Sequence, residues 1–566
     1  MIRQGGKPDV PSVLIALLMA GPVVAGLAGT ALPAFGYLPV LGFETFSLQP
    51  FQALFAEPGL ATSAWISFST GLVASVLSLA IVLVFMAGWY GTRTFGRVSR
   101  FLSPILSIPH AAAAIGLAFL IAPSGFFVRL LSPWMTGWDR PPDLLILNDP
   151  DGFAMTLGLV AKEVPFLFLM TLAAMNRPHL GAYFKAGATL GYGRMATFFL
   201  IILPQIYPLV RLPMLAVIAY ATSVVDVAEI LGPTTPRPLA PQLIVWMNDP
   251  DLSMRLMASA GALLQLTISA LAITFYLVLE KFAGIAFKSS ALTGKRFRQD
   301  RNGQIASLLP MLLILVLMAL STGLLVLWSV AKSWWFPAAF PQVLSIDRAV
   351  NAVLMAGPAL SATLTLALLS GVFATASTLW LLEARGFRKK RDSKKLKMLI
   401  FLPLLLPQIG FLFGLQMLFL ATGLGGTLTS VLLSHLIFVF PYAFLALSDP
   451  WNRLDPRYEK AAASLGISRS MIFWKIQLPL LLRPVLVTLA VCIAISVGQY
   501  LPTLMIGGGR IETVTTESVA LASGGNRQYA ALYGLLQLLV PLAGFTLVAL
   551  IPNLVHRNRS ALQMRG

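Results

Sequence analysis

The sequence is poor in the residue types from which disulfides, metal centres and most hydrolytic sites are built. Its 566 residues include one cysteine, Cys492, and four histidines. A single cysteine excludes an intramolecular disulfide, and so few histidines, without an H-E-x-x-H pattern, leave almost no ligand set for zinc. A phosphate-binding loop is also missing, because Gly294-Lys295 is followed by Arg296 and lacks the leading glycine of G-x-x-x-x-G-K-[ST]. We therefore predict no enzyme activity, no metal and no cofactor in this chain.

Charge is equally scarce. Charged residues make up 11% of the chain and hydrophobic residues 57%, with a mean hydropathy of +0.81. This composition is far too apolar for a soluble domain and indicates a polytopic membrane protein. The net charge of +19 comes from basic residues that cluster in short loops between apolar runs. The positive-inside rule requires such clusters, so we expect contact with lipid head groups and no nucleic acid.

Twelve apolar segments are long enough to cross a bilayer, which needs about 20 residues per helix. We therefore predict an all-α membrane protein of about 12 transmembrane helices, six in residues 1–283 and six in residues 306–566, joined by a basic linker at 284–305. The predicted spans are 12–34, 63–89, 101–122, 152–174, 205–231, 257–282, 306–331, 357–383, 398–421, 428–448, 480–505 and 532–554.

The loops alternate in charge along the chain. Basic residues follow the second and eighth spans, fill the linker and end the chain, whereas the opposite loops carry Glu44, Glu57, Asp139, Asp143, Asp149 and Asp151. We therefore expect both termini and the linker on the cytoplasmic side. The apolar run after Lys7 is too long for a cleaved signal peptide and is expected to be the first membrane helix.

One pattern occurs twice in the same register. Lys185 to Pro204 contains K-A-G-A-T-L-G, nine residues and I-I-L-P; Lys460 to Pro479 contains K-A-A-A-S-L-G, nine residues and I-Q-L-P. Matching positions are 275 residues apart (460 − 185 and 479 − 204). Pro109-His110 and Gly116 are mirrored by Pro407-Gln408 and Gly414 in the ninth span. Such a repeat predicts two halves of like architecture and equal orientation, related by a pseudo-two-fold axis along the membrane normal.

The repeated pattern resembles the E-A-A, three residues, G, nine residues, I-x-L-P loop of binding-protein-dependent ABC importer permeases. The resemblance implies the type I permease fold, with both halves fused in one chain as in the iron(III) and thiamine importers of bacterial inner membranes. It also implies two coupling loops, 183–204 and 458–479, each with a coupling helix that docks on a separate ABC ATPase subunit, which binds the ATP. The expected partners are two ATPase subunits, a periplasmic binding protein and the bilayer.

Eight residues are expected at the ATPase contacts: Lys185, Ala186, Gly187, Gly191, Lys460, Ala461, Ala462 and Gly466. The small residues let the helix backbone approach a groove closely, and each glycine permits the turn after the helix. One departure from the family pattern is that lysine replaces its leading glutamate in both loops, with Glu459 one place early in the second. The partner surface must differ there, or that contact is not made.

Polar groups inside apolar spans are candidates for a translocation path. These are His110, Glu163, Asp226, Glu229, Gln408, Gln499 and Tyr500. Asp226 and Glu229 are three residues apart and share a helix face. The alternatives are an acid pair satisfied by water or a loop at the outer interface, and a His110 that serves only in packing. The polar segment 507–527 is expected to be an outward loop, either solvated or in contact with the binding protein.

Two functional classes remain open at this stage. The first is an ABC importer permease for thiamine or a related small solute, with iron(III) as the alternative substrate. The second is a stand-alone secondary transporter with twelve helices. The duplicated loop favours the first class, because a secondary transporter has no reason to repeat it between the fourth and fifth spans of each half.

Overall fold

The computed structural model describes residues 10–105, 107–176, 180–294, 296–387 and 394–555. Within them, ten stretches are long and apolar enough to cross a membrane, and two bent helix pairs bring the number to as many as 12. The predicted all-α membrane fold of about twelve spans is therefore confirmed. Helices dominate because a chain in hydrocarbon must satisfy its backbone hydrogen bonds within each segment.

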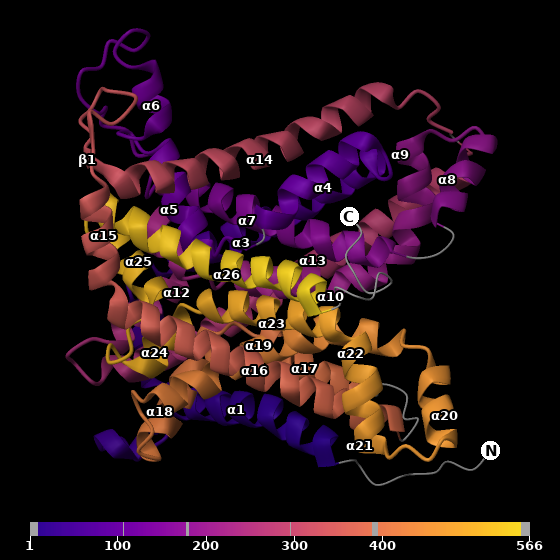
Figure 1. The fold of residues 1–566 in the computed structure, drawn as a ribbon. Helices are drawn as coiled ribbons and strands as arrows, with labels where there is room; N and C mark the ends of the chain where they lie inside the picture. Colours follow the sequence, from indigo (N-terminus) through magenta and orange to yellow (C-terminus); the bar gives the residue numbers. More distant parts are fainter. Residues whose placement is uncertain (1–9, 106, 177–179, 295, 388–393, 556–566) are drawn as a thin grey trace.

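The main membrane helices run nearly parallel (Figure 1). They are α1 (Val10–Ala34), α3 (Leu60–Trp89), α5 (His110–Ile121), α7 (Phe153–Met175), α10 (Leu203–Ala221), α13 (Met254–Leu292), α14 (Arg301–Val330), α16 (Gly357–Phe387), α17 (Lys394–Leu405), α18 (Ile409–Ala421), α19 (Leu428–Asn452), α23 (Leu482–Val497) and α26 (Arg527–Val555).

Shorter elements join or extend these helices. They are η1 (Pro39–Leu41), α2 (Gln49–Ala56), α4 (Arg93–Ile105), α6 (Phe126–Leu131), α8 (Leu180–Thr189), α9 (Arg194–Thr197), η2 (Phe198–Ile202), α11 (Asp226–Leu231), α12 (Leu239–Met247), the antiparallel strands β1 (Ala331–Ser333) and β2 (Val343–Leu344), α15 (Ile346–Met355), α20 (Pro456–Ser464), α21 (Arg469–Ile472), η3 (Phe473–Gln477), α22 (Leu478–Leu480), α24 (Leu501–Gly507) and α25 (Val514–Ser523).

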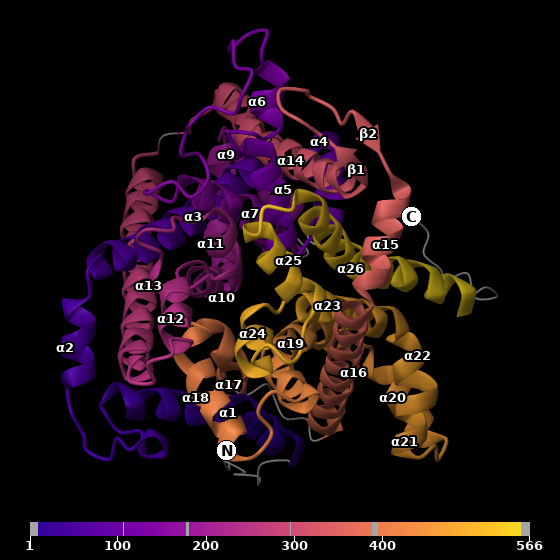
Figure 2. The ribbon, with the colours of Figure 1, turned by 90° about the vertical axis from the view of Figure 1, so that its left-hand side faces the viewer.

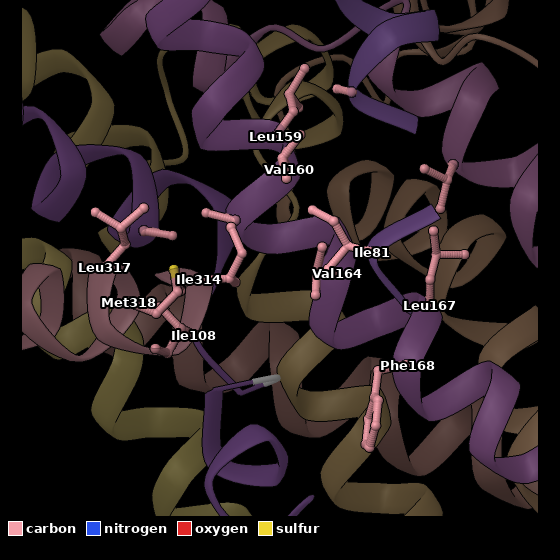
Figure 3. Packing of buried hydrophobic residues seen from close by; sticks show 14 of the residues in the cluster. Ile81, Ile108, Leu159, Val160, Val164, Leu167, Phe168, Ile314, Leu317 and Met318 are labelled. Atoms are coloured by element: carbon pink, nitrogen blue, oxygen red, sulfur yellow. The ribbon is translucent and has the colours of Figure 1, made fainter. Parts of the chain in front are cut away.

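The two halves exchange their first helices. α1 packs chiefly against α18, α13 and α17, whereas α14, the first helix of the second half, packs against α5, α3 and α26. Figure 2 shows both arrangements, with α14 beside α5 and α1 beside α18. Ile314, Leu317 and Met318 of α14 share one buried cluster with Leu159 and Val160 of α7 (Figure 3). The apolar core thus locks the halves together.

The mirrored glycines lie at these exchanged contacts. A Cβ on Gly414 would lie 2.0 Å from the carbonyl oxygen of Gly26 in α1, and a Cβ on Gly116 would lie 2.6 Å from that of Ser321 in α14. The Gly414 amide also donates to Thr30 Oγ1 at 3.1 Å. Small residues permit such close crossings of membrane helices.

Three expectations about the spans need correction. The fifth span of each half is not one helix through 205–231 or 480–505: α10 ends at Ala221 before α11, and α23 ends at Val497 before α24. The ninth span bends by 93° between α17 and α18. The supposed outward loop 507–527 contains α25, whose Val514, Thr515 and Ser518 are buried.

Side chains satisfy the carbonyls exposed by the broken fifth spans. Gln265 of α13 donates to the Thr222 carbonyl at 2.9 Å. At the equivalent break, 275 residues on (497 − 222), the Thr515 hydroxyl donates to the Val497 carbonyl. Gln537 of α26 in turn donates to Thr515 Oγ1 at 2.8 Å. The polar residues of α25 therefore serve the interior of the second half.

Candidate functional site

The repeated loops fold alike. α9 and α21 begin 275 residues apart (469 − 194), as do η2 and η3 (473 − 198) and the fourth spans α7 and α19 (428 − 153). In Figure 1 the pairs α8–α9 and α20–α21 lie at one end of the molecule, opposite α6, β1 and α15. The sequence repeat is therefore a structural repeat, and both of its loops open on the same side.

Each coupling helix ends at a glycine in the left-handed region. Gly191 has φ +80° and Gly466 has φ +74°. The Tyr192 amide donates to the Gly187 carbonyl at 2.9 Å, and the Ile467 amide to the Ala462 carbonyl at 3.2 Å. This pattern is a Schellman-type helix end, in which a β-carbon on the glycine costs about 1 kcal/mol. The predicted glycine turns are confirmed.

The small residues divide into an inner and an outer set. Gly187 and Ala462, which are equivalent (462 − 187 = 275), are buried, whereas Lys185, Ala186, Lys460 and Ala461 are exposed. A Cβ on Gly187 would lie 2.3 Å from Thr197 Oγ1. Gly187 and Ala462 thus pack inside the protein and do not offer a small surface to a partner, as the sequence suggested; only the outer set does.

Two arginines that the sequence analysis missed tie these loops to the membrane helices. The Arg194 guanidinium donates to the Tyr90 carbonyl, just after α3 ends, and lies 5.1 Å from the Phe184 ring centroid in α8. The equivalent Arg469 donates to Glu383 in the last turn of α16. The available signal was the shared arginine three residues after each turn glycine. A displacement of either loop is thereby transmitted to the second span of its half.

A carboxylate cluster lies inside the first half. His110 Nε2 of α5 lies 3.1 Å from Glu163 Oε1 of α7. The Tyr220 hydroxyl of α10 donates to Asp226 Oδ1 at 3.2 Å, and the Tyr220 and His110 rings lie 4.8 Å apart between centroids. Glu163 and Asp226 are 3% and 5% exposed, so both carboxylates are withdrawn from solvent. Three of the predicted path residues therefore meet, with Tyr220 added as a residue that sequence reasoning missed.

The second half contributes tyrosines to this cluster. Tyr442 of α19 lies within electrostatic range of Glu163 and Tyr220. Tyr500, at the break before α24, lies within the same range of Asp226 and Glu229. The cluster therefore sits where the two halves meet. We refer to His110, Glu163, Tyr220, Asp226, Tyr442 and Tyr500 as the carboxylate–tyrosine cluster.

The other predicted path residues are placed differently. Glu229 pairs with Arg237 at 3.4 Å, so it does not share a partner with Asp226. Gln499 lies just before Tyr500 and is 9% exposed. Gln408 is the residue before α18, and none of its hydrogen bonds within the described residues joins it to the cluster.

The second half holds an uncharged counterpart. His435 of α19 is 1% exposed, and its Nδ1 and Nε2 each lie 2.9 Å from a hydroxyl oxygen, of Ser496 and Thr503 respectively. Sequence reasoning missed His435, although its place in an apolar span beside the Ser496 segment was a signal. Both ring nitrogens have partners, so this histidine fastens α19 to α23 and α24.

Comparisons with known proteins agree with this geometry. Residues 384–558 match the family described as "Binding-protein-dependent transport system inner membrane component". The chain is 33% identical over 519 residues, 91% of its length and 93% of the relative's, to the inner membrane ABC transporter permease protein YnjC of Escherichia coli. It is 26% identical over 224 residues (39% of this chain, 84% of the relative) to the putative 2-aminoethylphosphonate transport system permease protein PhnV of Salmonella typhimurium. It is 28% identical over 194 residues (34% and 71%) to the spermidine/putrescine transport system permease protein PotC of Haemophilus influenzae.

Proposed function

The chain belongs to the permease family of binding-protein-dependent ABC transporters, and from this premise we propose that it supplies both permease halves of an importer and couples to two separate ATPase subunits. One observation carries the coupling: two loops in equal register expose Lys185, Ala186, Lys460 and Ala461 at the same end of the molecule. The secondary-transporter alternative has no support from this family.

In this proposal the end that carries α8 and α20 faces the cytoplasm of a bacterial inner membrane, together with both termini. The basic linker supports this orientation. A cysteine introduced at Ser290, after replacement of the buried Cys492, is expected to react with impermeant thiol reagents from the cytoplasmic side. Reaction from the periplasmic side would refute the orientation.

Coupling is tested by assembly. The purified chain alone is expected to hydrolyse no ATP, because it has no phosphate-binding loop. Co-expressed with its ATPase, it should purify with two ATPase subunits per chain, as measured by light scattering. A ratio of one to one, or substantial hydrolysis by the isolated chain, contradicts the proposal.

For the substrate, we propose a small organic cation that carries an amino group or a similar positive centre. The support is the carboxylate–tyrosine cluster, because buried carboxylates beside aromatic rings attract cations. Two of the relatives are named for 2-aminoethylphosphonate and for spermidine and putrescine, all of which bear amines. Thiamine also fits this class, but the names of the relatives cited above give it no support.

Iron(III) ranks below the organic cations. Among the described residues, no three His, Cys, Asp or Glu side chains come together in a group that could hold a metal ion. The binding protein that delivers the solute is expected to select it. Thermal-shift measurements on that protein with diamines, 2-aminoethylphosphonate, thiamine and iron(III) would rank the candidates, and a response to iron(III) alone would refute an organic cation.

The role of the cluster is tested in proteoliposomes that contain the whole importer. Glu163→Gln and Asp226→Asn keep side-chain size and remove negative charge. We expect each to lower uptake by about tenfold or more while ATPase subunits still bind. Asp139→Asn, at an exposed loop position, is the matched control. Uptake at the wild-type rate in both cluster variants would remove them from the path.

A further inference from the structure

The linker between the halves packs against the first coupling loop only. The Gly193 amide donates to the Arg296 carbonyl at 3.0 Å. A Cβ on Gly193 would lie 2.2 Å from the Phe297 carbonyl oxygen, so the two backbones touch. Residues 296–300, here called the linker strap, are therefore part of the loop's structure and not a slack tether.

Asp300 fixes this arrangement. Its Oδ2 accepts a hydrogen bond of 2.6 Å from the Met195 amide, in the first turn of α9. A carboxylate suits this place, because the amides at a helix N-terminus lack intrahelical partners and carry partial positive charge. Asp300 also directly precedes α14. The strap thus connects the first coupling loop to the first helix of the second half.

The start of α14 is fastened in turn to α3. The Trp89 indole donates to the Gln304 carbonyl at 2.9 Å, and the Gln304 amide donates to the Gly88 carbonyl at 2.9 Å. Arg194 binds the neighbouring Tyr90 carbonyl. Loop, strap, α3 and α14 consequently form one unit, in which the first loop reaches both halves.

The strap also changes the charge of the first loop. Guanidinium nitrogens of Arg298 and Arg296 would lie 3.3 and 3.4 Å from a Cβ on Gly191. Both arginines are exposed, as is Lys185. Around the equivalent Gly466, no heavy atom in the described part of the chain lies within 4 Å of such a Cβ. The second loop carries acidic Asp455 and Glu459 as well as basic residues, so the first is the more basic of the two.

We propose that the linker strap forms a wall of the first ATPase docking site and presents Arg296 and Arg298 to an acidic surface of the ATPase subunit. The two docking sites are then unequal, and the first holds its subunit through charge that the second lacks. This inference rests on the proposed coupling function. An anionic lipid surface is the competing occupant, and it is an outcome of the test below.

The experiment titrates ATPase onto the full chain in uncharged detergent, with native mass spectrometry to count bound subunits. Arg296→Glu/Arg298→Glu is compared with Lys281→Glu/Lys288→Glu, a charge-matched pair at exposed positions earlier in the linker region. We expect the strap variant to bind one subunit as wild type does and the other at least about tenfold more weakly. Its weaker step should also lose much of its salt dependence. The control pair should bind two subunits normally.

Three outcomes overturn the inference. The first is equal binding of two subunits by the strap variant and wild type. The second is a defect that appears only in vesicles with anionic lipid, which assigns the arginines to the membrane. The third is equal weakening by the control pair, which reduces the effect to net charge. If wild type binds no ATPase while the chain is folded, the proposed coupling itself fails. A variant confined to the other loop, Lys460→Glu, separates the cases, because it should weaken only the subunit that the strap variant retains.

Discussion

Gly187→Ala tests whether the packing between α8 and α9 sets the shape of the first coupling loop. The added Cβ would lie 2.3 Å from Oγ1 and 2.5 Å from Cγ2 of Thr197. Thr197 cannot turn away easily, because it is β-branched, is 1% exposed and donates its hydroxyl hydrogen to the Gly193 carbonyl at 2.9 Å. The coupling helix must therefore move outward by about 1 Å to reach an ordinary contact distance.

The energetic cost combines two opposing effects. Overpacking of this kind costs about 1–3 kcal/mol, and the better helix propensity of alanine returns up to about 1 kcal/mol. The net cost of about 1–2 kcal/mol falls on the α8–α9 contact, outside the bilayer. It corresponds to a loss of about 5- to 30-fold in the population of the docking geometry. We expect global thermal stability to change little.

The assay measures ATPase affinity and substrate uptake for Gly187→Ala, Thr197→Ala and the double variant. Thr197→Ala removes both clashing atoms, so the double variant should recover most of the affinity that Gly187→Ala loses. Ala462→Gly, the equivalent position in the second loop, is the control without overlap. Wild-type affinity in Gly187→Ala, or failure of Thr197→Ala to restore it, would refute the reasoning.

Three further variants test other contacts. Gly414→Ala places a Cβ 2.0 Å from the Gly26 carbonyl oxygen and should lower the unfolding temperature strongly, whereas Gly21→Ala, with open space on the same α1, should not; equal effects would contradict the exchanged packing. His435→Ala removes the partner of two hydroxyls in the membrane interior and should cost about 3 kcal/mol of stability, more than His110→Ala at a part-exposed site, as thermal unfolding will report. Arg469→Ala breaks a part-exposed contact with Glu383, so stability should change by at most about 1 kcal/mol while uptake falls, and unchanged uptake would exclude the contact from coupling.

The sequence predicts the number of spans and the coupling loops well because both leave local signals. An apolar run must become a helix in hydrocarbon, whatever it packs against. Gly191 and Gly466 mark the turns because only glycine adopts a positive φ without strain. The exchange of α1 and α14 has no such signal. Its trace, the mirrored Gly116 and Gly414, shows that something approaches these helices closely but not which helix it is.

The breaks within the fifth spans could not be predicted for a related reason. The segment from α10 to α11 is apolar enough to be taken for one helix, and its break at Thr222 depends on Gln265, a residue from the next span. Likewise the polarity of α25 suggested solvent, whereas Thr515 serves the Val497 carbonyl. Polar residues that satisfy a distant backbone resemble loop residues until the tertiary structure is known.

The two halves have diverged at their ends and in their polar interior while the register of the loops has stayed fixed. Gly116 and Gly414 are 298 residues apart, but the elements from α7 and α19 onward are 275 apart, so the first half carries 23 more residues between its third and fourth spans (298 − 275). This insertion contains α6, where Arg129 donates to the Ala338 carbonyl of the second half at 3.1 Å. At the other end of the molecule, the linker strap joins the first loop to α14. In both places the added chain binds the halves to each other, which separate subunits could achieve only by association. Fusion into one chain therefore explains why the first half can hold the buried carboxylates while the second keeps the neutral His435: each half always meets the same partner, so neither must contain a complete site.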